Sequence, residues 1–291
     1  MKKQYLFAAT SIALWSTMPT ISKLLLHKMD SFQVLCVSAI FASFFLLAVN
    51  VVTGNIKRLK EYNLKDYIIT VLIGLPGMFL YYVFFYTGTS MMPASQAFIV
   101  NYLWPIMSVV FACILLKEKM TSRKLLAIVI SFFGVVIVTS ADIINFNEKI
   151  IIGALFCVAG AVSYGIFTAL NQKYKYDKRI SMMLVLFVTF ILTGIINLAS
   201  GKPMELGGFE LLGLGWNGMF SIGIATTSWQ IALEKGNTAK ISNLAYITPF
   251  VSLIWTSLFL DDEKISGVHI VGLAVIILGI FVQLKDKKNK A

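Results

Sequence analysis

Residues 101–138 read "NYLWPIMSVVFACILLKEKMTSRKLLAIVISFFGVVIV", and residues 245–282 read "AYITPFVSLIWTSLFLDDEKISGVHIVGLAVIILGIFV". Both stretches contain a proline, a glutamate and a glycine in the same order: Pro105, Glu118 and Gly134 in the first, and Pro249, Glu263 and Gly279 in the second. In each copy the glycine follows the glutamate by 16 residues, and the copies lie about 145 residues apart. The chain is therefore predicted to be an internal duplication.

The amino-acid composition indicates whether these copies fold in water or in a membrane. Of the 291 residues, 58% are hydrophobic and 13% are charged, with a mean hydropathy of +0.81. Soluble domains carry about 25% charged residues. Apolar runs of roughly 20 residues, the length of a membrane-spanning helix, recur along the chain. The sequence therefore predicts an all-α integral membrane protein and excludes a soluble two-domain protein.

Ten transmembrane helices are predicted from these runs. Their ranges are 5–26, 32–53, 67–87, 93–116, 123–140, 150–172, 181–199, 211–233, 240–260 and 267–284. They divide into one half at residues 1–141, a second half at 150–285, and a short cytoplasmic tail at 286–291. Because each half holds an odd number of spans, the second half must enter the membrane in the opposite direction. Inverted repeats are typical of secondary transporters, whose substrate site lies near mid-membrane between the halves.

Charge predicts the orientation. With the N-terminus inside, 20 of the 25 lysines and arginines fall in loops on the inner side. The positive-inside rule then places both termini in the cytoplasm of a multi-pass inner or plasma membrane protein. The formal charge of +11 is accounted for by topology and anionic lipid, so no nucleic-acid partner is expected. The expected partners are the lipid bilayer and a small-molecule substrate, with the chain a monomer or weak homodimer.

Four consecutive or near-consecutive side chains in the first stretch are unusual for a lipid-facing helix: Asn101, Tyr102, Trp104 and Pro105. At about 100° per residue they share one broad helical face. An asparagine facing lipid would leave its amide unsatisfied at a cost of several kcal/mol. This face is therefore predicted to turn toward the bundle interior or a wet cavity. Pro105 also frees the carbonyl of Asn101 to accept a hydrogen bond.

Other predicted helices carry similar faces. The side chains predicted to contact a substrate are Trp15, Tyr81, Tyr82, Phe85, Asn101, Tyr102, Trp104, Tyr164, Trp229, Ser242 and Tyr246. Pro19, Pro105 and Pro249 are predicted to kink helices or to act in gating. A ring-lined chamber with a few amide and hydroxyl groups suits a flat or apolar solute, or an organic cation held over ring faces. Helix packing and interfacial aromatic belts are the alternative roles of these residues.

Several kinds of chemistry have no signature in the sequence. Neither a nucleotide-binding loop nor a hydrolase motif occurs, so no catalytic residues, cofactor or metal site are predicted and the chain is not expected to be an enzyme. Cys36, Cys113 and Cys157 lie in apolar runs and are interpreted as small hydrophobes. No Asp or Glu occupies the middle of a predicted span, which favours transport without proton exchange at a buried carboxylate. Lys23 is expected either to reach outward or to meet an anionic group at the outer mouth.

On the repeat pattern and the aromatic first helix "ALWSTMPTISK" (13–23), the chain resembles the EamA branch of the drug/metabolite transporter superfamily over about residues 5–284. Within that branch, "LWS" (14–16), "NYLWP" (101–105) and "YITPFVS" (246–252) resemble the YddG-type exporters of aromatic amino acids and methyl viologen. Position 164 carries tyrosine where that subgroup usually has tryptophan.

The resemblance implies two inverted five-helix repeats and an exporter of small metabolites, with aromatic or apolar amino acids as the first substrate class. Lipophilic or quaternary organic cations are the second substrate class. A polar-solute channel would require a continuous polar stripe or charge ring along its pore. A membrane enzyme acting on lipid precursors would require an acidic or histidine cluster at headgroup level.

Overall fold

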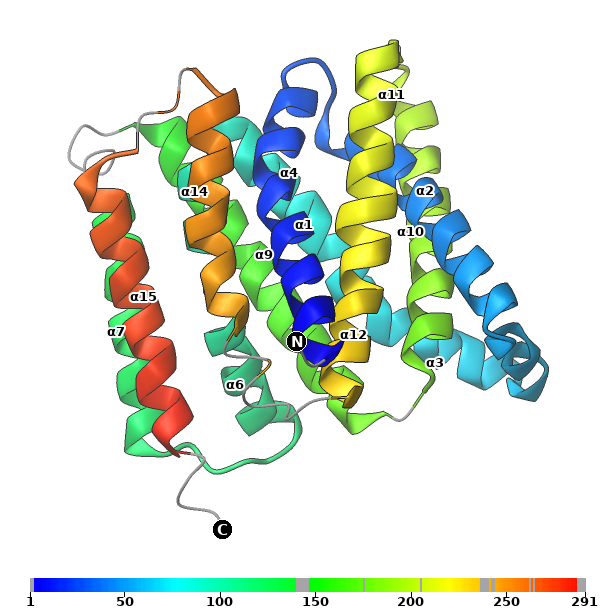
Figure 1. Cartoon of the computed structure of the whole chain (residues 1–291), viewed down its shortest axis with the longest axis horizontal. Coiled ribbons are helices and arrows are strands. Elements are labelled where there is room, and N and C mark those ends of the chain that lie inside the picture. Colours follow the sequence, from blue (N-terminus) through cyan, green and yellow to red (C-terminus); the bar gives the residue numbers. More distant parts are fainter. Residues whose placement is uncertain are drawn as a thin grey trace.

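A computed structural model describes residues 3–139, 147–174, 176–204, 206–235, 241, 244–261, 263 and 265–286. These residues form a helical bundle without β-strands (Figure 1). The helices of the first half are α1 (Lys3–Leu26), α2 (Ser31–Val52), η1 (Asn55–Glu61), α3 (Leu64–Leu75), η2 (Pro76–Leu80), α4 (Tyr81–Met91), α5 (Ala94–Asn101), α6 (Trp104–Leu115) and α7 (Ser122–Val138). Those of the second half are α9 (Glu148–Lys173), α10 (Lys178–Ser200), α11 (Gly208–Gly215), η3 (Trp216–Ile224), α12 (Ala225–Lys235), η4 (Ala245–Ile247), α14 (Thr248–Phe259) and α15 (Gly267–Asp286).

The bundle is that of a multi-pass membrane protein. Five helices or helical runs in the described residues are long and apolar enough to cross a bilayer: Ser31–Val52, Leu64–Met91, Ala94–Leu115, Glu148–Lys173 and Lys178–Ser200. Each of the ten ranges predicted from the sequence overlaps a described helix. The number of ten spans remains a prediction, because the other helices do not reach the same length and hydropathy.

Equivalent helices of the two halves pair in opposite directions. Gly134 of α7 lies against Gly272 of α15, where an added Cβ would come within 2.8 Å of the Gly272 carbonyl oxygen. Further along, a Cβ on Gly279 would lie 2.7 Å from the Ala127 carbonyl oxygen. As residue numbers fall along α7 they rise along α15, so the two helices are antiparallel and touch backbone to backbone. The two glycines of the repeated pattern make this close approach.

The helices α2 and α10 form a second antiparallel pair. The Asn50 side chain donates to the Arg179 carbonyl at 3.4 Å, and the Asn197 side chain donates to the Phe32 carbonyl at 3.3 Å. Each helix begins with an aspartate cap: Asp30 accepts from the first turn of α2, and Asp177 from that of α10. The halves therefore run through the bundle in opposite senses, as the odd number of predicted spans per half requires.

The first helix of each half inserts into the other half. Helix α1 packs against α12 and α14, and its counterpart α9 packs against α4 and α6. Figure 1 shows α1 beside α12 and α14 near the middle of the bundle. This exchange relates the two halves by an approximate two-fold axis and makes one interleaved body.

The predicted helix over 93–116 is interrupted, and the interruption recurs in the second half. Helix α5 ends at Asn101 and α6 begins at Trp104, with Pro105 in its first turn. The 3₁₀ turn η4 likewise precedes α14, which carries Pro249 in its first turn. Proline lacks the N–H that would continue the preceding helix, so both breaks follow from the sequence.

The ranges 67–87 and 211–233 are helical as predicted, but each departs from a regular α-helix. Each range contains a π-helical segment, η2 and η3, after which α-helix resumes at Tyr81 and at Ala225, 144 residues apart. Pro76 at the start of η2 cannot donate its amide, which favours a wider turn. In η3, Gly218 lies so close to α2 that an added Cβ would overlap the Ser38 carbonyl oxygen.

The two ends of the bundle differ in the charged residues they carry. The basic end is where α1 begins and α15 ends, and it carries Arg58, Lys124 and Lys178. The opposite end carries Asp30, Glu210 and Glu263.

Candidate functional site

A cavity of about 460 Å³ extends into the bundle from the basic end. Its polar mouth includes Thr70, Glu118, Lys124, Asn171, Gln172, Tyr176, Lys178 and Ser181. Deeper in, the walls are aromatic and come from both halves: Trp15 and Trp104 from the first, and Tyr164, Trp229 and Tyr246 from the second. The cavity therefore lies at the interface between the two repeats.

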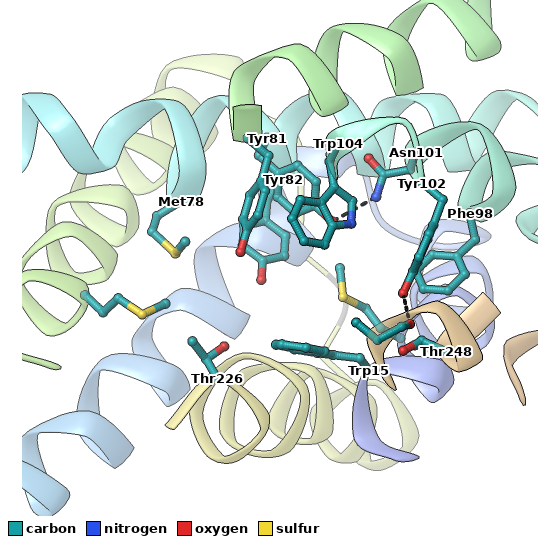
Figure 2. A pocket seen from close by; sticks show the side chains of 14 residues that line it. Trp15, Met78, Tyr81, Tyr82, Phe98, Asn101, Tyr102, Trp104, Thr226 and Thr248 are labelled. Atoms are coloured by element: carbon teal, nitrogen blue, oxygen red, sulfur yellow. Dashed lines mark hydrogen bonds between the residues drawn. The ribbon is translucent and has the colours of Figure 1, made fainter. Parts of the chain in front are cut away.

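A smaller pocket of about 70 Å³ forms the inner end (Figure 2). It is lined by Trp15, Met18, Met78, Tyr81, Tyr82, Phe98, Asn101, Tyr102, Trp104, Tyr164, Met182, Thr226, Ala245 and Thr248. In Figure 2, Trp15 from α1 lies across the space from Trp104 and Tyr82. Ring faces thus bound the pocket from two sides, with methionine and threonine side chains between them.

The aromatic rings of this wall pack against one another. Tyr164 lies 5.0 Å from Tyr81 and 5.2 Å from Trp104 between ring centroids, the latter pair nearly perpendicular at 78°. On the facing side, the Trp15 and Trp229 centroids are 5.3 Å apart. Tilted and edge-to-face contacts at these distances are favourable aromatic geometries. The wall therefore consists of two facing ring clusters, one from α4, α6 and α9 and the other from α1 and α12.

The polar groups of the opening sequence stretch are buried and hydrogen-bonded. Asn101 is 1% exposed, and its Nδ2 donates to the Tyr81 phenol oxygen at 2.9 Å. The Tyr102 phenol donates to the carbonyl oxygen of Ala245 at 2.5 Å, from the first half to the second. These contacts answer why a membrane helix carries an asparagine and a tyrosine together: both face the bundle interior, as predicted from the cost of exposing them to lipid.

Most of the residues predicted to contact a substrate come together here. Trp15, Tyr81, Tyr82, Asn101, Tyr102, Trp104 and Tyr164 line the inner pocket, and Trp229, Tyr246 and Pro105 line the larger cavity. Ser242 lies outside the described residues. Pro19 is buried within an unbroken α1, and Pro249 is buried in the first turn of α14.

Phe85 occupies a different position from the one predicted. Its side chain is fully buried behind Tyr81, with the two rings stacked at 6.0 Å and 4°, and it lines neither cavity. Phe85 follows Tyr81 by about one turn within α4, which runs from the aromatic wall toward the opposite end of the bundle, so its ring lies beyond the pocket. Phe85 supports the wall instead of forming it.

Seven residues of the inner pocket were not among those predicted to contact a substrate: Met18, Met78, Phe98, Met182, Thr226, Ala245 and Thr248. Met18 follows Trp15 by three residues and so lies on the same helical face, a signal that was available. Thr248 directly precedes Pro249 at the helix break, where Trp104 precedes Pro105 in the first half. Met182 had no local signal, because its helix is amphipathic without an evident aromatic or polar cluster.

The opposite end of the cavity is closed by packing and by two charged side chains. Phe85, Tyr86 and Phe98 are buried between the aromatic wall and the opposite end of the bundle. Lys23 Nζ donates to the carbonyl oxygens of Thr89 at 2.9 Å and Met92 at 2.7 Å, at the end of α4. The Glu263 carboxylate accepts from the backbone N–H groups of Ala94 and Ser95, at the start of α5. The positive charge of Lys23 thus lies at the C-terminal end of α4, and the negative charge of Glu263 lies at the N-terminal end of α5, where each is favoured by the helix dipole.

These contacts place Lys23 and Glu263 on the corner between α4 and α5. Glu263 therefore caps the start of α5, and this contact joins the two halves. Lys23 is engaged with backbone carbonyls at the closed end in this state. Within the described residues, no group of three or more His, Cys, Asp or Glu is arranged to hold a metal ion.

A membrane-embedded bundle of two inverted, interleaved halves, with a cavity at their interface reachable from one end, defines the class of membrane transporters. The chain belongs to the EamA-like transporter family, whose model matches residues 2–140 and 151–284. The resemblance noted from the sequence is therefore confirmed at family level.

Relatives with assigned names are transporters. An uncharacterized transporter of Archaeoglobus fulgidus is 25% identical over 292 residues, covering 98% of this chain and 100% of the relative. The uncharacterized inner membrane transporter YhbE of Escherichia coli K12 is 22% identical over 262 residues, covering 87% and 80%. The aromatic amino acid exporter YddG of Ancylobacter novellus is 22% identical over 183 residues, covering 62% and 64%.

A solved crystal structure superposes with a TM-score of 0.69 at 20% identity and covers 96% of each chain. At this identity the likeness supports the fold alone.

Proposed function

We propose that the chain is a secondary transporter that exports small metabolites, with aromatic or apolar amino acids as the first substrate class, by alternating access. The observation that carries this proposal is the aromatic-walled cavity between the two halves, open toward the basic end and packed closed beyond Tyr102. Its 460 Å³ falls in the range of about 300–1,000 Å³ that is usual for small-molecule sites.

The orientation of the chain in the membrane decides to which side the cavity opens. With the basic end in the cytoplasm of an inner or plasma membrane, both termini are cytoplasmic and the cavity faces the cytoplasm. A substrate made in the cell would then enter past Lys178 and Lys124 and reach the rings. This is the loading state of an exporter. The chain acts in this proposal as a monomer or weak homodimer, without a cofactor.

The wall chemistry supports an amino acid with a flat or apolar side chain. Trp15 and Trp104 offer ring faces on two sides of the inner pocket, and Met18 and Met182 offer adaptable apolar contact. Thr248 is 1% exposed and lines the inner pocket, where its hydroxyl lies beside the Tyr102 phenol. It is available to the ammonium or carboxylate group of a bound amino acid. The exporter YddG, although a distant relative, supports the same class.

Lipophilic or quaternary organic cations are the second substrate class, because electron-rich ring faces also attract cations. A polar-solute channel is the main rival from another class. It would require an open polar path, whereas the described lining of the inner end is mostly apolar or aromatic. A membrane enzyme is less well supported, because the named relatives are transporters.

The positions of the charged side chains in the cavity indicate which energy source drives transport. The charged side chains of its described lining, Glu118, Lys124 and Lys178, lie at the mouth, where Glu118 pairs with Lys124 at 3.0 Å. We infer that transport is driven by the substrate gradient or the membrane potential and not by proton exchange at a buried carboxylate. Substrate uptake that required a pH gradient, with stoichiometric acidification of the opposite side, would contradict this inference.

The experiment is flux in proteoliposomes loaded with unlabelled amino acid. Radiolabelled phenylalanine added outside should accumulate by exchange, saturate with concentration, and only equilibrate across the membrane when the internal amino acid is omitted. A channel would give flux that neither saturates nor depends on internal substrate. Accumulation of a quaternary amine but of no amino acid would move the second substrate class to first place.

A further inference from the structure

One hydrogen bond joins the two helix breaks across the halves. The Tyr102 phenol donates to the Ala245 carbonyl at 2.5 Å, in a fully buried position. Ala245 precedes Pro249 by four residues, so no N–H is available at that proline to continue the α-helical ladder. The carbonyl instead accepts from the Thr248 N–H and from Tyr102. A proline-freed acceptor in one half is thus held by a tyrosine of the other.

The approximate two-fold axis creates the same pair in reverse. At a spacing of 144 residues, the counterparts are Tyr102 and Tyr246, Asn101 and Ala245, and Pro105 and Pro249. Pro105 withholds an amide from the Asn101 carbonyl in the same way. The reciprocal bond would run from the Tyr246 phenol to the Asn101 carbonyl.

That reciprocal bond is not formed in this structure. Tyr246 lines the open cavity, and its ring packs edge-on against Phe281 with centroids 5.9 Å apart. Among the described residues, the Tyr246 hydroxyl has no hydrogen-bond partner. The two halves are therefore alike in sequence at this point and unlike in contacts.

The bond is formed on the closed side of the bundle, and its counterpart is absent on the open side. Tyr102 and Ala245 meet where α5 packs against α14, which is the closed side. Tyr246 faces the side on which the cavity is open. In inverted-repeat transporters each half takes up the conformation of the other when access is exchanged.

We propose that Tyr102 and Tyr246 alternate as donors to the carbonyl of the opposite break. The Tyr102–Ala245 bond holds the state that is open at the basic end, and a Tyr246–Asn101 bond holds the state that is open at the opposite end. The inference rests on the proposed alternating access and adds the contacts that select between its two states. Both tyrosines are positioning residues for the transport cycle.

The test measures the population of the open state directly. The background replaces Cys36, Cys113 and Cys157 with alanine, and Ser108→Cys places one thiol on the cavity wall between the break and the basic end. The rate of reaction with a membrane-impermeant maleimide, in lipid nanodiscs without substrate, reports how often the basic end is open.

Tyr102→Phe should slow this labelling by roughly two- to tenfold, the shift that one net hydrogen bond supports. Tyr246→Phe should not slow labelling but should slow exchange in proteoliposomes. The double variant, which lacks both bonds, should label at close to the rate of the reporter background. The matched control is Tyr67→Phe, which removes a phenol–carbonyl bond to Leu59 at 2.8 Å within one half and outside the cavity, and should label at the background rate.

Unchanged labelling in folded Tyr102→Phe, or slowing by both single variants, would overturn the proposal. If Tyr102→Phe does not fold, the Tyr246→Phe variant still tests the proposal, because slowed labelling in that variant would overturn it. Labelling needs no substrate, so it is independent of whether amino acids are transported. A protein that exchanged phenylalanine but showed no labelling shift would retain the proposed function and lose this inference alone.

Discussion

The segments "NYLWP" (101–105) and "AYITP" (245–249) break their helices at the same place and build different walls. Both interrupt the helix just before a proline, and both carry a tyrosine at the same distance from it. The other positions differ: Asn101 stands opposite Ala245, and Trp104 opposite Thr248. The shared residues shape the backbone, which both halves need in order to exchange conformations. The differing residues shape the cavity, which is therefore asymmetric around a nearly symmetric frame.

The largest effect is expected at the position where the two segments differ most in size. Trp104→Ala should lower export by about ten- to a hundredfold, because tenfold corresponds to about 1.4 kcal/mol and an indole buries a large contact area. Tyr82→Ala should act in the same direction. Initial rates of phenylalanine exchange, normalised to the amount of protein inserted in the liposomes, measure both.

Thr248→Ala, the counterpart of Trp104→Ala, should reduce the same rate only several-fold, because it removes one hydroxyl and no ring. Equal losses at the two positions would mean that the wall is functionally symmetric. Full activity of Trp104→Ala at normal insertion would return Trp104 and its ring neighbours to a packing role.

The second comparison concerns Gly74 and Gly218, which occupy equivalent positions on the third helical runs of the two halves. A Cβ on Gly218 would overlap the Ser38 backbone carbonyl, whereas one on Gly74 would meet the Val185 side chain. Gly218→Ala should therefore cost about 1–3 kcal/mol of stability by overpacking, and Gly74→Ala less. Thermal unfolding in nanodiscs provides the ranking.

A second substitution sharpens this ranking. Val185→Ala removes the methyl groups that a new Cβ at position 74 would strike, so Gly74→Ala combined with Val185→Ala should be more stable than expected from the two single changes. No side-chain change can relieve the contact of residue 218 with a backbone oxygen. A Gly218→Ala protein as stable as the parent would contradict the close helix crossing.

The smallest effects are expected at two equivalent ion pairs between the halves. Arg58 meets Asp177 at 2.7 Å, and Lys202 meets Asp30 at 3.3 Å. Surface pairs contribute about 0–1 kcal/mol, and the Asp177 side chain is the less exposed acceptor, at 13% against 30%. Arg58→Gln should therefore lower the unfolding temperature slightly more than Lys202→Gln, with both differences shrinking at high salt. The reverse order would show that burial of the acceptor does not govern these pairs.

The sequence allowed the frame to be predicted because prolines, glycines and charges act locally. Pro105 and Pro249 determine where two helices break, and Gly134 and Gly279 determine where two others touch. The face containing Asn101 and Trp104 was assigned correctly to the interior, because an amide cannot face lipid without cost.

The remaining features depended on contacts between distant segments. Phe85 shares a helical face with Tyr81 but lies one turn nearer the closed end, so it was assigned to the wall and lies behind it. Met182 reaches the pocket from α10, and only the packing of that helix against the first half reveals its position. The closed end likewise depends on Glu263, which caps a helix that begins 169 residues earlier in the chain.

Equilibrium binding of radiolabelled phenylalanine to the purified protein in nanodiscs tests the central claim most directly. The account predicts saturable binding that Trp104→Ala abolishes and that Trp216→Ala retains, since Trp216 is 36% exposed and stacks on Phe220 outside both cavities. Binding of equal strength in the parent and in folded Trp104→Ala would place the substrate elsewhere and contradict the account.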